Sequence, residues 1–235
     1  MKALHGHVRH WLSQQERLVL LAIAVAVLGT AVFFFFSLEV MEGDTQKLDE
    51  WAVDYARDPG DLAVYRGPAW LFGVVRDLTA LGSIAVIGLV SLGAIGFAAL
   101  RGNRRLALLI LSAALGGFAM NSVLKNLFDR PRPYLPHVID IKTRSFPSGH
   151  AMVSAAVYLS IAALLATRER RRLLKAYILG AGMFVTGLVG LTRVYLGVHY
   201  PSDVLAGWLA GLIWAVLCAL AARAVLGVRR EPSGP

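Results

Sequence analysis

Residues 19–38, VLLAIAVAVLGTAVFFFFSL, form a run of twenty residues without a charged side chain. A helix needs about 20 mostly apolar residues to cross the hydrocarbon core of a bilayer. The run is too long for the apolar core of a cleavable signal peptide, and no clear small-x-small cleavage site follows it. We therefore interpret it as a retained transmembrane anchor, in preference to a signal peptide covering residues 1–37.

Similar apolar runs recur along the chain. Of its 235 residues, 57% are apolar and 17% are charged, whereas about a quarter of the residues in a soluble domain are charged. The one cysteine, Cys218, lies in an apolar run, which excludes an internal disulfide and predicts a core position. The pattern predicts an all-α polytopic membrane protein with six transmembrane helices, at roughly 19–38, 82–100, 105–124, 150–167, 174–195 and 203–227.

A further apolar segment, residues 62–80, lies between the first two predicted spans. It carries Arg66, Pro68, Arg76 and Asp77, which argue against a seventh transmembrane helix. We expect it to form an amphipathic helix lying at the membrane interface.

The basic residues fall in short clusters between the apolar runs. If six helices alternate in direction, 14 of the 24 lysines and arginines lie on one side, which the positive-inside rule identifies as the cytoplasm. Residues 1–18 are then a cytoplasmic N-terminus, 19–227 a membrane domain and 228–235 a cytoplasmic tail. The net charge of +9 is not arranged as a basic face interleaved with aromatics, which argues against nucleic acid as a partner.

Three clusters of polar residues, 125–133, 145–150 and 192–203, lie at the ends of predicted spans on the opposite, non-cytoplasmic side. Taken singly, Lys125 could reach the headgroups, Ser148 could cap a helix, and the two histidines could be structural. Together the clusters supply three cations (Lys125, Arg132, Arg193), two histidines (His150, His199), one acid (Asp203) and a helix start at Ser148 and Gly149. That inventory is what a phosphoryl-transfer site requires.

The cations and the helix start suit a bound phosphate. Arg132 and Arg193 can each offer a planar fork of N–H donors, and Lys125 offers a compact charge. The backbone N–H groups of Ser148 and Gly149 would add donors at a helix N-terminus. Because three fixed cations can replace the metal ions that other phosphatases use, we predict no metal and no cofactor.

The histidines suit nucleophilic catalysis. His199 and Asp203 are four residues apart, so the carboxylate can hold one ring nitrogen and leave the other free to attack phosphorus. His150 would then be the general acid for the leaving oxygen and later the base for water. Ser148 is the competing nucleophile. Asp203 raises the pKa of His199 and the three cations lower it, and the residues alone leave the balance open.

These clusters carry a family resemblance. Lys125-x6-Arg132-Pro133, Pro147-Ser148-Gly149-His150 and Arg193-x5-His199-x3-Asp203 occur in that order, and they resemble the three-part signature of the type 2 phosphatidic acid phosphatase superfamily. The third element departs from the common Ser-Arg start, because this chain has Thr192 there. Threonine retains the hydroxyl, so we expect activity to survive.

The resemblance implies a helical core of six transmembrane segments. By carry-over, His199 forms a phosphohistidine, Asp203 positions it and His150 donates the proton. Lys125, Arg132, Ser148, Gly149 and Arg193 would hold the phosphate.

The resulting expectation is a metal-independent lipid phosphatase of the inner membrane. Its partners would be the bilayer and a membrane lipid phosphate such as phosphatidylglycerophosphate, phosphatidic acid or undecaprenyl diphosphate. The alternatives are a phosphotransferase that passes the phosphoryl group to another lipid, a haloperoxidase, and a non-catalytic lipid-binding or transport protein.

Overall fold

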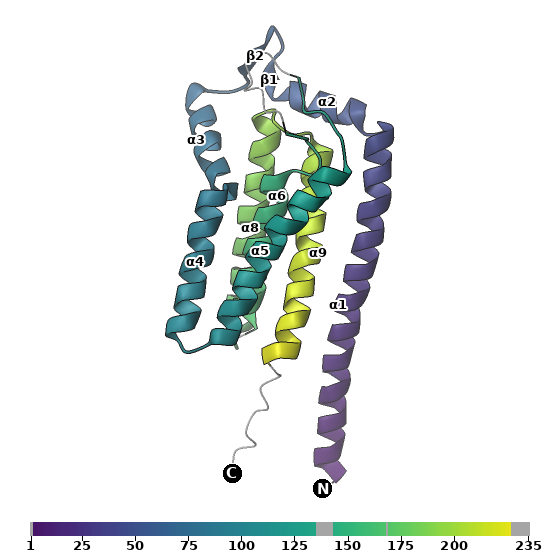
Figure 1. Cartoon of the computed structure of the whole chain (residues 1–235), viewed down its shortest axis with the longest axis vertical. Helices are drawn as coiled ribbons and strands as arrows, with labels where there is room; N and C mark the ends of the chain where they lie inside the picture. Colours follow the sequence, from purple (N-terminus) through teal and green to yellow (C-terminus); the bar gives the residue numbers. More distant parts are fainter. Residues whose placement is uncertain (1, 135–142, 168, 227–235) are drawn as a thin grey trace.

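The chain forms a bundle of long helices that run roughly along one axis (Figure 1). The computed structural model describes residues 2–134, 143–167 and 169–226. The elements are α1 (Lys2–Glu42), α2 (Gln46–Tyr55), β1 (Arg57–Asp58), β2 (Asp61–Tyr65), α3 (Ala69–Thr79), a 3-10 turn (Ala80–Gly82), α4 (Ile84–Leu100), α5 (Arg104–Leu127), α6 (Gly149–Ser154), a π-helical turn (Ala155–Leu159), α7 (Ser160–Ala166), α8 (Arg172–Tyr195) and α9 (Pro201–Leu226).

The membrane-spanning pattern agrees with the sequence. Within the described residues, five helical segments are long and apolar enough to cross a bilayer: Val19–Glu42, Arg104–Leu127, Gly149–Ala166, Arg172–Tyr195 and Pro201–Leu226. The remaining predicted span belongs to a pair of helical segments, Ala69–Gly82 and Ile84–Leu100, that are bent by 50° at their junction. Counting this pair as one span gives six, and the predicted all-α polytopic fold is confirmed.

The helix predicted over residues 62–80 is wrong in its first part. Asp61–Tyr65 form β2, which pairs antiparallel with β1, and α3 begins only at Ala69. Gly67 has a φ of +114°, in the region that favours glycine, and it precedes Pro68. A residue before proline is disfavoured in the α conformation, so the helix starts after this pair.

Helix α2 lies in the acidic segment between the first two spans, where no helix was predicted. Figure 1 shows it crossing the end of the bundle at a steep angle to α1. It buries Asp49 and Val53, which are one helical turn apart, and Val53 packs against Tyr200. The segment therefore forms a cap over that end of the bundle.

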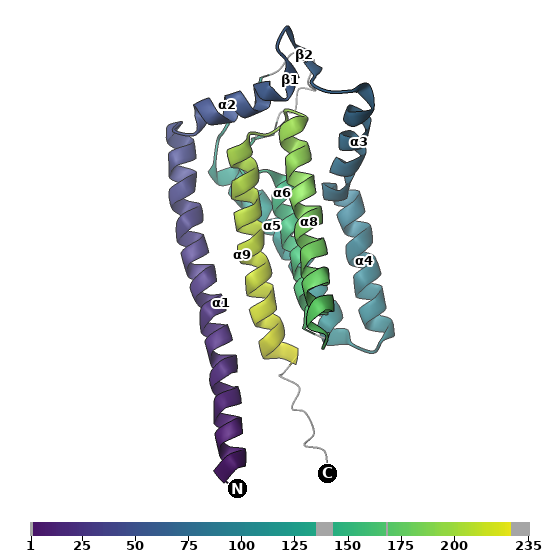
Figure 2. The ribbon, with the colours of Figure 1, turned by 180° about the vertical axis from the view of Figure 1, so that it is seen from behind.

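The same end gathers the polar clusters. The C-terminal ends of α5 and α8 and the N-terminal ends of α6 and α9 meet there, below α2 and far from the start of α1 (Figure 2). Helix direction therefore brings together clusters that lie far apart along the chain.

Helix α9 packs at the centre, against α1, α5, α6, α7 and α8. Two glycines of α9 let its backbone contact α6 and Ser148, the residue that precedes α6. A Cβ added at Gly207 would lie 2.8 Å from the Ser148 carbonyl oxygen, and one added at Gly211 would lie 2.5 Å from the Met152 carbonyl oxygen. Because backbone atoms cannot rotate away as side chains can, the two helices are fixed at close contact.

We expect Gly211→Ala to destabilise the protein by about 1–3 kcal/mol, as overpacking of a tight interior does. Gly187→Ala on α8 is the matched control, because its added methyl group meets nothing within 4 Å. Thermal unfolding of both variants in detergent tests this. Equal melting temperatures would show that the α9–α6 contact is not tight.

Candidate active site

A cavity of about 290 Å³ lies at the capped end of the bundle. Every one of the three polar clusters contributes to it, together with the junction between α3 and α4. The lining residues are Gly82, Ile84, Phe118, Asn121, Lys125, Arg132, Thr143, Gly149, His150, Val153, Arg193 and His199. Three cations and two histidines thus face one space, with apolar groups beside them.

His199 is held from behind by a short chain of polar contacts. Its Nδ1 lies 3.3 Å from the Ser145 hydroxyl oxygen and 3.5 Å from Asp203 Oδ2. The Ser145 hydroxyl donates to the same carboxylate oxygen, and the Tyr200 backbone N–H donates to it at 3.0 Å. Asp203 therefore lies beside His199 as its spacing predicts, and Ser145 shares the contact.

The other ring nitrogen of His199 faces the cavity. Arg132 Nη1 lies 3.0 Å from Nε2, and a guanidinium can only donate. Nε2 must therefore carry the lone pair, which places the hydrogen on Nδ1, toward Ser145 and Asp203. The imidazole is the tautomer that a nucleophilic Nε2 requires.

The charge balance left open by the sequence favours the neutral ring. Burial lowers the pKa of His199 to about 4; contact with Asp203 raises it, while the charges of Arg132 and Arg193 lower it. In the free protein the imidazole is uncharged at neutral pH.

Arg132 is fixed by the segment that precedes α6 and by the turn between α8 and α9. Its Nε donates to the Thr143 carbonyl at 2.8 Å, its Nη2 to the Thr143 hydroxyl at 2.9 Å, and its Nη1 to the Val198 carbonyl at 2.6 Å. Burial lowers the pKa of this guanidinium, against the pull of Asp203. Lys125 is anchored nearby, through a 3.0 Å bond to the Arg144 carbonyl.

The α3–α4 junction contacts the remaining cation and the second histidine of the cavity, Arg193 and His150. Arg193 Nη1 donates to the Thr79 hydroxyl at 3.0 Å, and its buried Nε has no partner within the described part of the chain. A Cβ at Gly82 would lie 3.0 Å from His150 Cδ2, so the 3-10 turn packs directly on this imidazole. Thr79 and Gly82 were not among the predicted site residues.

Ser148 and Gly149 occupy different positions. Ser148 is fully buried and does not line the cavity, and its N–H already donates to the Asp203 carbonyl at 2.9 Å. The expectation that this N–H would bind phosphate does not fit the geometry. Gly149 does line the cavity, and a Cβ there would lie 3.2 Å from Asn121 Oδ1.

Thr192, the departure from the common third motif, satisfies its hydroxyl within its own helix. The hydroxyl donates to the Val189 carbonyl at 2.6 Å. This backbone contact needs only a hydroxyl group, which serine and threonine share.

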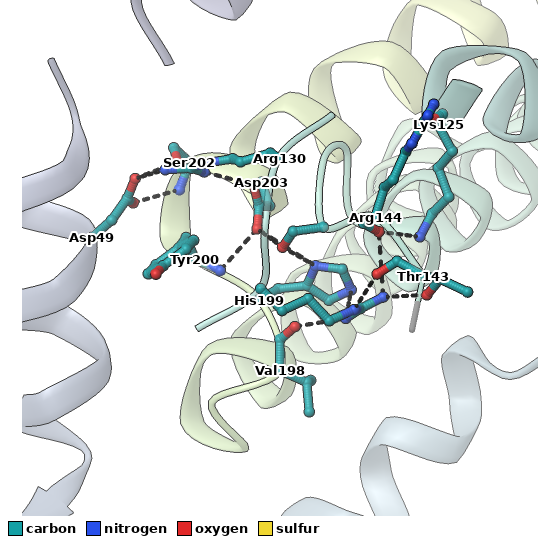
Figure 3. A network of polar contacts seen from close by, with 12 residues as sticks. Asp49, Lys125, Arg130, Thr143, Arg144, Val198, His199, Tyr200, Ser202 and Asp203 are labelled. Atoms are coloured by element: carbon teal, nitrogen blue, oxygen red, sulfur yellow. Dashed lines mark hydrogen bonds and ion pairs between the residues drawn. The ribbon is translucent and has the colours of Figure 1, made fainter. Parts of the chain in front are cut away.

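A buried ion-pair network lies behind His199 and was missed from the sequence. Arg130 Nη1 lies 2.6 Å from Asp203 Oδ1, and Nη2 lies 2.8 Å from Asp49 Oδ2 on α2. Figure 3 shows the contacts running from Asp49 through Arg130 and Asp203 to His199 and on toward Lys125. Burial alone would lower the pKa of Arg130, but the two carboxylates outweigh it and raise the pKa.

The comparisons with known proteins agree with this arrangement. The model of the PAP2 superfamily matches residues 105–225. Phosphatidylglycerophosphatase B of Bacillus subtilis is 40% identical over 99 residues, 40% of this chain and 47% of that protein, so the match spans about half of the relative. An undecaprenyl-diphosphatase of Sulfolobus acidocaldarius is 36% identical over 91 residues, 39% of this chain and 35% of that protein.

The fold also matches a solved structure. The crystal structure of a transmembrane PAP2-type phosphatidylglycerolphosphate phosphatase from Bacillus subtilis superposes with a TM-score of 0.74, at 27% identity, over 85% of this chain and 96% of that one. The family model covers more than half of the 235 residues, including all three polar clusters. The chain belongs to the PAP2 superfamily.

Proposed function

We propose that this protein is a metal-independent lipid phosphatase that works through a phosphohistidine on His199. The observation that carries the proposal is the position of its Nε2, a lone-pair nitrogen at the wall of a cavity lined by Lys125, Arg132 and Arg193. Two relatives are named as a phosphatidylglycerophosphatase and an undecaprenyl-diphosphatase, and these names support the reaction class.

The phosphate of the substrate would bind among the three cations. In the free protein Arg132 Nη1 donates to His199 Nε2. An entering phosphate oxygen can take over that donor, which releases the nitrogen lone pair where phosphorus arrives. Fixed cations stabilise the charge that develops on the equatorial oxygens.

In the first step, Nε2 attacks phosphorus, an N–P bond forms and the bond to the leaving oxygen breaks. His150 acts as the general acid for that oxygen. The positive charge that develops on the His199 ring is balanced by Asp203, directly and through Ser145. In the second step, His150 accepts a proton from water, water attacks phosphorus and the N–P bond breaks, which releases inorganic phosphate.

A lipid substrate suits the position of the cavity. Its polar wall stands beside Ile84, Phe118 and Val153, so an anionic headgroup and apolar chains can be accommodated together. The cavity lies at the end of the bundle, where the lipid tails need not leave the bilayer. We propose phosphatidylglycerophosphate, phosphatidic acid or undecaprenyl diphosphate as substrates.

The basic clusters support an inner-membrane orientation with both termini in the cytoplasm. The cavity would then open on the periplasmic side.

His199→Ala is expected to abolish phosphate release from a panel of these lipids in mixed micelles, because no nucleophile remains. Ser148→Ala should retain measurable activity, since Ser148 does not line the cavity. Release of free phosphate without an added acceptor lipid would distinguish hydrolysis from phosphotransfer. The reverse order of activities would overturn the assignment of the nucleophile.

We expect full activity in excess chelator, because the three cations carry out the charge stabilisation that metal ions supply elsewhere. Initial rates are compared before and after dialysis against EDTA, then again with added Mg²⁺. A loss that Mg²⁺ restores would refute the proposal of metal independence.

The low pKa of His199, about 4, predicts where activity declines in acid. The neutral form persists as pH falls through the ordinary imidazole value of about 6.5, so kcat/KM should show no acid limb from this group above about pH 5. The ionisation of the substrate is measured by phosphorus NMR, and the pH profile of kcat/KM is corrected for it. An acid limb near pH 6.5 that remains after this correction would contradict a buried, neutral nucleophile.

A further inference from the structure

The guanidinium of Arg130 is buried between two carboxylates from distant parts of the chain. It bonds Asp203 Oδ1 at 2.6 Å and Asp49 Oδ2 at 2.8 Å, and Nη1 also donates to the Ser202 hydroxyl at 2.7 Å. All three charged side chains are at most 5% exposed. None of them lines the cavity.

The Asp49 carboxylate is itself fixed. It accepts from the Ser202 N–H at 3.0 Å, from the Ser202 hydroxyl at 2.5 Å and from the Thr45 hydroxyl at 2.8 Å. Helix α2 is therefore bonded to the first turn of α9, next to Asp203. Since α2 caps the bundle, the network reaches from the cap to the residue that orients His199.

Burying one cation and two carboxylates costs free energy of desolvation, and such networks often add little to stability. Their better attested effect is to fix one geometry. Here Arg130 holds Oδ1 of Asp203, which leaves Oδ2 to face Ser145, the Tyr200 N–H and His199 Nδ1. A carboxylate with only one oxygen held could rotate away from the ring.

We propose that Asp49 and Arg130 are positioning residues, which hold the Asp203 carboxylate in the orientation that keeps His199 Nε2 aimed into the cavity. They act through Asp203 and touch no substrate. This inference rests on the proposed function, because it concerns the same nucleophile. It also assigns a role to α2, a helix outside the three signature motifs.

The test is Asp49→Asn, which removes one carboxylate with little change in shape. We expect the single-turnover rate, with enzyme in excess over lipid phosphate, to fall roughly 10–100-fold, the loss typical when an outer partner that orients a metal-binding histidine is removed. When the folded enzyme is in saturating excess, that rate constant does not depend on the folded fraction. Competitive inhibition by inorganic phosphate should stay within about twofold of the parent value, because the cations are untouched.

Asp54→Asn is the matched control, since it removes the same charge from the exposed face of the same helix. Both measurements should match the parent protein. Arg130→Lys tests the bridge itself: a single ammonium group cannot replace the two-pronged contact, so a similar loss of rate is expected.

Three results would overturn the inference: a parent-like rate for Asp49→Asn, a parent-like rate for Arg130→Lys, or phosphate inhibition weakened as much as the rate. The last would indicate general disruption of the cavity. If the unmodified protein releases no phosphate from any lipid, the proposed function fails instead. If the unmodified protein is active and the Asp49→Asn variant has a parent-like rate, the positioning role is refuted and the proposed function stands.

Discussion

The carboxylate of Asp203 is the contact on which the arrangement of the site depends. It lies buried at the start of α9 and accepts hydrogen bonds from Arg130 after α5, Ser145 before α6 and the Tyr200 backbone between α8 and α9. A buried charge is tolerated when donors surround it, so these segments must converge on one point. The His199 ring lies against the same carboxylate, which therefore helps to fix the position of the ring.

The lining of the cavity and the residues behind the His199 imidazole carry opposite charges. The carboxylates lie behind the imidazole, whereas the residues that line the cavity in the described part of the chain carry positive or no charge. Neighbouring cations repel one another until an anion arrives. Binding of a phosphate, as proposed, would relieve that repulsion, to which a neutral imidazole adds nothing.

Hydropathy was sufficient to predict the transmembrane segments, because the membrane imposes its constraint locally on each run of residues. Motif spacing was sufficient to predict that His199 and Asp203 would be neighbours. The Asp49–Arg130 pair joins residues 81 positions apart, and such pairing leaves no periodic signal in one sequence. Asp49 is one of many acidic residues in its segment, and nothing in its immediate sequence distinguishes it as the buried one.

Two smaller errors have equally local causes. Gly67 and Pro68 delay the start of α3, and residues 61–65 pair with β1 although their apolar character suggested a helix. Ser148 stands at a helix start of the kind that binds anions, but its N–H already donates a hydrogen bond to the Asp203 carbonyl. In both places a backbone detail determines the outcome, and side-chain type alone does not encode it.

The glycine contact between α9 and α6 fixes the helix that carries His150 against the helix that carries Asp203, whereas the bent α3–α4 pair forms a less buried side of the cavity. His150 on α6 lines the cavity and Asp203 on α9 lies behind His199; because their backbones are in contact, the separation of these two residues is fixed. Gly82 and Ile84 belong to the bent α3–α4 pair, and α3 has no buried residue of its own. A substitution at Ile84 can therefore reshape this side of the cavity, whereas a side chain at Gly82 would press on Val189 and on the His150 ring.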